Sequence, residues 1–195
     1  MQLTDNLFLI LLCLALAAVC LLVRQGRTSF PKSFSARCVW VCDGDTIWVR
    51  SGWLSRRRKL RLIGMDAPES EQAFGREAER CLRRLAQGKR LTVTALCADR
   101  YGRWVSRVHV GGCDLSLEMI RAGYAWPYYA YLKNLSKSEQ CEYRRAGALA
   151  KAERKGLWSG SNPEAPWSWR KRHRTFFWRI VLWLCRAIRS LFSLH

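Results

Sequence analysis

Apolar residues alternate with polar residues over much of the chain between residues 36 and 112. The alternation has the period of two that is typical of a half-buried strand. Turn-forming residues separate four such runs, which cover residues 36–50, 58–66, 89–99 and 103–112. The first run contains a turn signal of its own, Asp43-Gly44, so the pattern predicts four or five strands.

Three other segments repeat their apolar residues with the period of a helix. Residues 70–88 place Phe74, Ala78, Cys81, Leu82 and Leu85 at helical spacing, and a glycine follows them. Further helices are predicted within residues 114–124 and 137–158. Strands with helices in the middle and at the end predict a small β-barrel with helical caps, in the α+β class.

Residues 7–23 form an uncharged apolar segment, close to the length of about 17–25 residues that a membrane-spanning helix needs. We interpret it as a retained anchor rather than a cleaved signal, because no Lys or Arg precedes it, although Ala15-Leu16-Ala17 would suit cleavage. The basic residues that follow favour the cytoplasmic side for the domain, which conflicts with an exported role. The protein is therefore expected to be membrane-associated or exported, and the side of the membrane stays open.

Residues 161–195 form a basic, aromatic-rich tail. A helix beginning near Thr175 would separate apolar residues from arginines at heptad spacing, which favours an interfacial helix on a membrane surface. Packing of this helix on the barrel and capture of nucleic acid are the alternatives. The chain thus divides into a membrane segment with its linker, residues 1–30, a central domain, residues 34–160, and the tail.

The charge of the chain restricts its partners. Lys and Arg number 34 against 15 Asp and Glu, a formal net charge of +19, so the surface attracts polyanions such as nucleic acid or anionic lipid. Charge alone does not choose between these two. The nine cysteines contain no CxxC pair, which argues against a zinc site, and we expect them to be buried free thiols.

Acidic residues follow two of the predicted strands. Asp43-Gly44 is a strong hairpin signal, because both residue types tolerate the positive φ angles of a tight turn, but a turn leaves Asp45 unexplained. Asp66 and Glu69 form a second acidic cluster after the second run. If the two loops meet at one end of a barrel, their oxygens suit a hard cation such as Ca²⁺. The alternative for each cluster taken singly is a solvated surface loop.

Two arginines accompany the acidic clusters. Arg61 precedes Asp66 by five residues, and Arg103 stands directly before the last run. The guanidinium group presents planar, bidentate donors to phosphate oxygens, so two arginines beside a cation would form a site for a phosphodiester. A solvated charge at a strand end is the alternative for each arginine. His109 lies in an alternating strand and is interpreted as structural rather than as a catalytic base.

The series of motifs resembles that of the thermonuclease, or staphylococcal-nuclease-like, family. The resemblance covers residues 36–158 and rests on VCDGDTIWV, KLRLIGMDAPES, FGREAER, DRYGRWVSRVHV, LSLEMIRAGYAW and AKAERKGLW, in the order and spacing of the family. It implies an OB-fold barrel of five strands with about three capping helices. It also implies a Ca²⁺-dependent nuclease that hydrolyses phosphodiester bonds of DNA and RNA.

The same resemblance implies a role for each site residue. Asp45 and Asp66 match the calcium carboxylates of the family, and Ala67 stands where a backbone carbonyl is thought to reach the metal. Glu69 matches the residue that activates the attacking water. Arg61 and Arg103 match the two phosphate-binding arginines. The nucleotide-binding residues expected from this comparison are Arg100, Tyr101, Tyr129 and Tyr131.

The expected function is cleavage with little sequence specificity, leaving 3′-phosphate ends, by a monomeric catalytic domain. Single-stranded or frayed nucleic acid is the expected substrate, because basic residues contact the backbone while tyrosines stack on bases of any kind. Membrane lipid is the expected partner of the N-terminal segment and of the tail helix. The rival function is a membrane-tethered module that binds nucleic acid without cutting it. A membrane-active cationic protein is a third class, but it leaves the acidic clusters unexplained.

Overall fold

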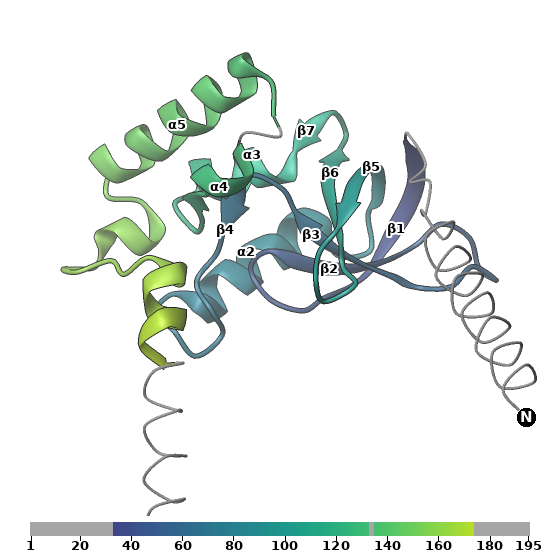
Figure 1. Ribbon diagram of the computed structural model, residues 1–195, viewed down its shortest axis with the longest axis horizontal. Coiled ribbons are helices and arrows are strands. Elements are labelled where there is room, and N and C mark those ends of the chain that lie inside the picture. The colour runs from purple at the N-terminus through teal and green to yellow at the C-terminus, as the bar shows by residue number, and fades with distance from the viewer. Residues whose placement is uncertain (1–32, 133–134, 174–195) are drawn as a thin grey trace, which may run out of the picture. The chain divides into compact units, whose positions relative to one another are not determined.

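The computed structural model describes residues 33–132 and 135–173. Five long strands form a closed barrel in the order β3-β2-β1-β5-β6, in which each strand is antiparallel to the next. Parallel pairing of β3 with β6 closes the barrel (Figure 1). This pairing places Arg61 opposite Val105. The strands are β1 (Phe34–Val41), β2 (Thr46–Arg50), β3 (Arg58–Leu62), β5 (Arg90–Ala98) and β6 (Trp104–Val110). The predicted α+β barrel is confirmed.

The barrel strands bury alternate residues, as the sequence pattern requires. In β5, for example, Leu91, Val93 and Ala95 are buried, whereas the residues between them are more exposed. The alternation is interrupted in β1, where the register with β2 shifts between Cys38 and Trp40. Such a bulge increases the local twist of a strand, which helps a sheet to close on itself.

The helices begin and end at residues that the sequence pattern places only approximately. They are α2 (Gly75–Ala86), α3 (Leu115–Arg121), α4 (Tyr129–Leu132), α5 (Lys137–Ala152) and the 3₁₀ helix η1 (Gly156–Ser159). The helix predicted from residue 70 begins only at Gly75, because Gln72 and Gly75 donate backbone hydrogen bonds into turns and Phe74 has a φ of 65°. The helix predicted to residue 158 ends at Ala152, since Arg154 has a φ of 51° and η1 follows.

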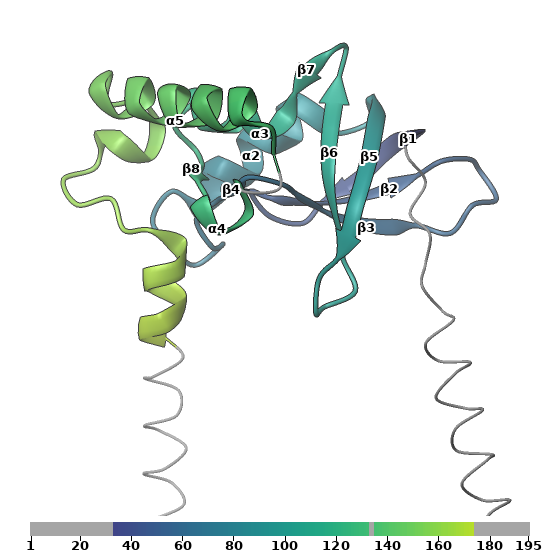
Figure 2. The same cartoon turned by 45° about the horizontal axis from the view of Figure 1, so that its top comes forward.

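Two-residue strands join the helical part to the barrel. The β4 strand (Met65–Asp66) pairs with β8 (Trp126–Pro127), and β7 (Cys113–Asp114) extends the sheet beside β6. Figure 2 shows α3, α4 and α5 gathered at one side of the barrel. Residues 166–173 are also helical, so part of the region that we assigned to the tail continues the ordered domain.

No helix among the described residues is long and apolar enough to cross a membrane. The predicted anchor, residues 7–23, and the tail helix predicted from Thr175 lie outside the described residues.

The cysteines of the central domain differ from their predicted burial. All six are free thiols; Cys38 and Cys81 are buried, but Cys97, Cys113 and Cys141 are exposed. The prediction is wrong for these three, because they lie at the solvent-facing ends or faces of β5, β7 and α5, where no apolar layer covers them.

Candidate active site

The two acidic loops meet, and Gly44 is the reason. A Cβ atom at Gly44 would lie 2.6 Å from the Cβ of Ala67 and 2.8 Å from that of Ala78, so only glycine lets the β1–β2 turn approach the second loop this closely. The φ angle of Gly44 is not positive. The predicted hairpin is present, but its glycine serves close approach rather than a left-handed backbone.

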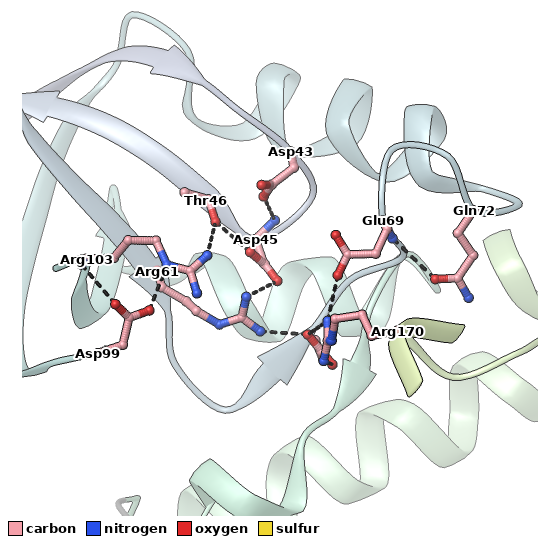
Figure 3. Close-up of polar contacts among 10 residues, drawn as sticks. Asp43, Asp45, Thr46, Arg61, Glu69, Gln72, Asp99, Arg103 and Arg170 are labelled. Atoms are coloured by element: carbon pink, nitrogen blue, oxygen red, sulfur yellow. Dashed lines mark hydrogen bonds and ion pairs between the residues drawn. The ribbon is translucent and has the colours of Figure 1, made fainter. Parts of the chain in front are cut away.

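Arg61 links the carboxylates of the two loops. From β3, its Nη1 lies 2.7 Å from Asp45 Oδ2 and its Nη2 lies 2.6 Å from Asp66 Oδ1 (Figure 3). Asp66 is fully buried, and Asp45 and Arg61 are only 6% and 9% exposed. Burial alone would raise the pKa of Asp45, but the Arg61 charge and a 2.7 Å hydrogen bond from Thr46 Oγ1 outweigh it and hold that pKa below its usual value.

The carboxyl group of Asp43 differs from that of Asp45, two residues along the chain, in its partners and in its pKa. Its carboxylate accepts a hydrogen bond from the backbone N–H of Asp45 at 3.0 Å, but no arginine is paired with it among the described ion pairs. Burial, and next the charge of Asp45, raise the pKa of Asp43 to about 7. The sequence analysis assigned Asp43 to a turn only, and its place in the acidic cluster was missed.

Arg103 is held in position by the β5–β6 turn. Its Nε lies 2.7 Å from Asp99 Oδ2, while Asp99 Oδ1 accepts hydrogen bonds from the backbone N–H groups of Tyr101 and Arg103. The Nη1 of Arg103 donates to Thr46 Oγ1 at 3.2 Å, which brings this arginine to the edge of the Arg61 cluster. Asp99 therefore fixes Arg103 at the site, a function that sequence reasoning did not assign.

The predicted nucleotide-binding residues fall in different places. Tyr101 is 73% exposed, and the guanidinium carbons of Arg100 and Arg103 both lie 5.5 Å from the centre of its ring. Tyr129 is exposed, and Arg144 lies over its ring. Tyr131 belongs to α4, but its side chain is outside the described part of the structure.

A cleft of about 580 Å³ connects these groups. The acidic loops, β3, the β5–β6 turn and Tyr128 line it, with the lining residues Asp45, Arg61, Ala67, Glu69, Arg100, Tyr101 and Arg103 among the predicted set. Tyr128 lies beside the predicted Tyr129 in sequence and is the tyrosine of this pair that lines the cleft. The cleft combines carboxylates with arginines and has an exposed aromatic ring at its rim.

One further arginine enters this cleft from the C-terminal region. Arg170 Nη1 lies 2.7 Å from Glu69 Oε1, and its Nη2 lies 2.6 Å from Asp66 Oδ2 (Figure 3). More than a hundred residues separate Arg170 from these partners in sequence. No periodicity or spacing connects such distant residues, so the sequence analysis missed this contact and placed Arg170 in the tail.

The donor set suits a hard cation by its chemistry. Asp45 and Glu69 line the cleft, Asp66 lies buried behind it and is joined to Asp45 through Arg61, and Ala67 follows Asp66 with a backbone carbonyl. Within the described ranges, however, no three acidic, His or Cys side chains are arranged to hold a metal ion. Both oxygens of Asp66 accept hydrogen bonds from arginines instead.

The fold and the cleft together define a class of protein: an OB-like α+β barrel with a carboxylate and arginine cluster at one rim. The model of the family described as staphylococcal nuclease homologue matches residues 59–160, more than half of the chain. The chain belongs to this family, and the resemblance inferred from its motifs is confirmed.

Two of the similar proteins described here carry nuclease names. A protein of Escherichia coli O157:H7 named as an uncharacterized endonuclease is 39% identical over 139 residues, which cover 70% of this chain and 84% of that protein. The staphylococcal-like nuclease CAN1 of Arabidopsis thaliana is 39% identical over 121 residues, covering 62% and 36%. A 38.1 kDa uncharacterized protein of Capnoides sempervirens is 45% identical over 123 residues, covering 62% and 34%. The chain thus matches about a third of the length of these plant relatives.

Proposed function

We propose that this chain is a nuclease that hydrolyses phosphodiester bonds of DNA or RNA with little sequence specificity. The observation that carries the proposal is one cleft lined by Glu69, Arg61 and Arg103, in which Arg61 pairs with two buried carboxylates. The endonuclease and nuclease names of the relatives support it.

We propose further that cleavage depends on Ca²⁺. Asp45, Asp66 and the carbonyl of Ala67 are the groups that would hold the ion, because Asp45 and Ala67 line the cleft and Asp66 adds a carboxylate directly before Ala67. The bound cation would supply Lewis-acid charge neutralisation at the phosphate. The chemistry of the donors supports this assignment.

The remaining residues divide the reaction between them. Glu69 would accept a proton from the attacking water, since its carboxylate faces the cleft from a loop. Arg61 and Arg103 would donate hydrogen bonds to the phosphoryl oxygens as negative charge develops there. Departure of the 5′ oxygen would leave 3′-phosphate ends.

Substrate binding would rest on contacts to the phosphate backbone of the nucleic acid and on stacking of its bases against aromatic side chains. Arg100 and Arg103 frame the exposed ring of Tyr101, so a base could stack on this ring while the arginines contact phosphates. A single-stranded or frayed strand exposes its bases for this contact. Tyr129 and Tyr131 remain proposed nucleotide contacts. Association with membrane lipid through the N-terminal segment and the tail also remains a proposal.

The function is tested by cleavage of labelled single-stranded DNA by the full-length chain, with Ca²⁺ or with a chelator. Glu69→Gln keeps the size of the side chain but removes the base, and it should lower the rate by about 10²–10⁴-fold. Glu71→Gln is the matched control, because Glu71 is exposed two residues away in the same loop. Tight binding without cleavage under any divalent metal would instead support the non-catalytic binding module.

A further inference from the structure

We propose that Arg170 is a built-in competitor for the cation site, so that Ca²⁺ binds only when residues 163–173 release the acidic loop. The proposal rests on the proposed Ca²⁺-dependent function and concerns its regulation. It arises from the position of a single guanidinium group between Asp66 and Glu69.

Arg170 engages the oxygens that the cation would need. Asp66 Oδ2 accepts from Arg170 Nη2 at 2.6 Å, and Asp66 Oδ1 accepts from Arg61 and, at 3.2 Å, from Arg170 Nη1. The same Nη1 donates to Glu69 Oε1 at 2.7 Å. A positive group with N–H donors therefore faces both a proposed metal ligand and the proposed base. A Ca²⁺ ion at these oxygens would lie beside the Arg170 guanidinium, which already donates to them, and would be repelled by its positive charge.

Of the two arginines that pair with Asp66, Arg170 is the one that can be displaced from the carboxylate. Arg61 belongs to a barrel strand and is almost completely buried, so its removal would require the barrel to open. The side chain of Arg170 is 38% exposed and belongs to the helical residues 166–173, outside the barrel. The displacement of a partly exposed side chain that lies outside the barrel leaves the barrel core intact.

Residues 163–173, the segment that carries Arg170, are held against the domain by a few contacts. The side-chain amide of Gln72 donates to the carbonyl of Glu164 at 2.6 Å, which ties the segment to the loop of Glu69. The Trp167 ring packs at 5.7 Å from the Trp126 ring and at 5.5 Å from the Tyr128 ring. These contacts place residues 163–173 over the cleft wall and aim Arg170 into the acidic cluster.

Calcium binding measured by titration calorimetry on the full-length chain tests the competition. Arg170→Gln should bind Ca²⁺ about 5–150-fold more tightly than the wild type, the usual range for coupling between two sites. Arg145→Gln removes the same charge from an exposed position on α5 and should leave the affinity unchanged. Equal affinity of the wild type and Arg170→Gln, or weaker binding by the variant, would overturn the proposal.

Hydrogen exchange of the wild-type chain provides a second measurement that needs no variant. Because coupling is reciprocal, Ca²⁺ should accelerate amide exchange in residues 163–173 while it slows exchange around residues 43–46 and 66–69. Protection of all three segments by Ca²⁺ would overturn the competition but leave the calcium-dependent function standing. Absence of Ca²⁺ binding by both the wild type and Arg170→Gln would overturn the two proposals together.

Discussion

Arg61 is the residue on which the charge balance of the site depends. It pairs with two carboxylates at 2.7 and 2.6 Å, and all three groups are nearly or fully buried. A buried ion pair contributes modestly as a whole, but the removal of one partner leaves the other charge without compensation. Arg61 therefore has a structural function in addition to the phosphate-binding function proposed for it.

Arg61→Ala should lower the free energy of unfolding by about 3–5 kcal/mol, in addition to its effect on cleavage. Urea unfolding in the presence of a chelator measures this change. Arg121→Ala serves as the control, because Arg121 pairs with Glu118 and Glu142 at the surface, where an ion pair is worth about 1 kcal/mol or less. Similar losses in the two variants would show that the Asp45 and Asp66 charges are compensated by other groups.

Asp43 gives the stability a dependence on pH. Its pKa is about 7 in the folded chain against 3.8 for an unperturbed aspartate, so between these values the folded state holds a proton that the unfolded state has released. Stability contributed by this group therefore falls as the pH rises from about 4 to about 7.

Asp43→Asn removes this titration. With a chelator present, the variant should be more stable than the wild type by about 4 kcal/mol at pH 8, while the two proteins should be about equally stable at pH 4. Chemical unfolding at both pH values measures the difference. If the difference between the two proteins does not change with pH, the Asp43 carboxyl ionises normally.

At the residue scale, the sequence predicts the site residues whose chemistry is visible in short motifs. Asp45 lies in the turn before β2, Asp66 ends β4 and Glu69 lies in the loop that follows, and the prediction that the two acidic segments meet is correct. Asp43 was missed because a turn already explained it. Arg170 was missed because its contact depends on how the chain returns to the barrel, which no local pattern encodes.

At the scale of elements, the junction between the Glu69 loop and α2 is the most tightly constrained. A Cβ atom at Gly75, the first residue of α2, would overlap the carbonyl oxygen of Glu69. The preceding Phe74 adopts a left-handed backbone, which turns the chain into the helix. The position of the proposed base is thus set by the start of a helix, and the predicted helix beginning at residue 70 missed this turn.

Gly75→Ala should displace the Glu69 loop while α2 still forms, because alanine is a better helix residue than glycine. A misplacement of about 1 Å at a catalytic group can cost about 100-fold in rate, so cleavage should fall by at least about 10-fold with unchanged helical circular dichroism. Gly52→Ala is the control, since no atom lies within 4 Å of a Cβ at that position. Cleavage by Gly75→Ala at the wild-type rate would contradict this account.

At the scale of the whole molecule, the alternation of residues predicts the strands but not the closure of the barrel. The antiparallel pairs β1–β2, β2–β3 and β5–β6 follow from turns between neighbouring strands. The antiparallel pair β1–β5 and the parallel pair β3–β6 join strands that are distant in sequence, with α2 between the members of each pair. The boundary at residue 160 was drawn where charge and aromatic content change. The contacts of Gln72 and Arg170 cross that boundary, since packing depends on surfaces rather than on composition.

The closing pair β3–β6 has a consequence for how the protein loses its site. Arg61 belongs to β3, and Arg103 directly precedes β6. Both arginines therefore lie at the β3–β6 pair, which is the seam where the barrel closes. If the seam opens, the two guanidinium groups separate in the same event that exposes the core. The arrangement of Arg61 and Arg103 at the site therefore lasts only as long as the β3–β6 pair that closes the barrel.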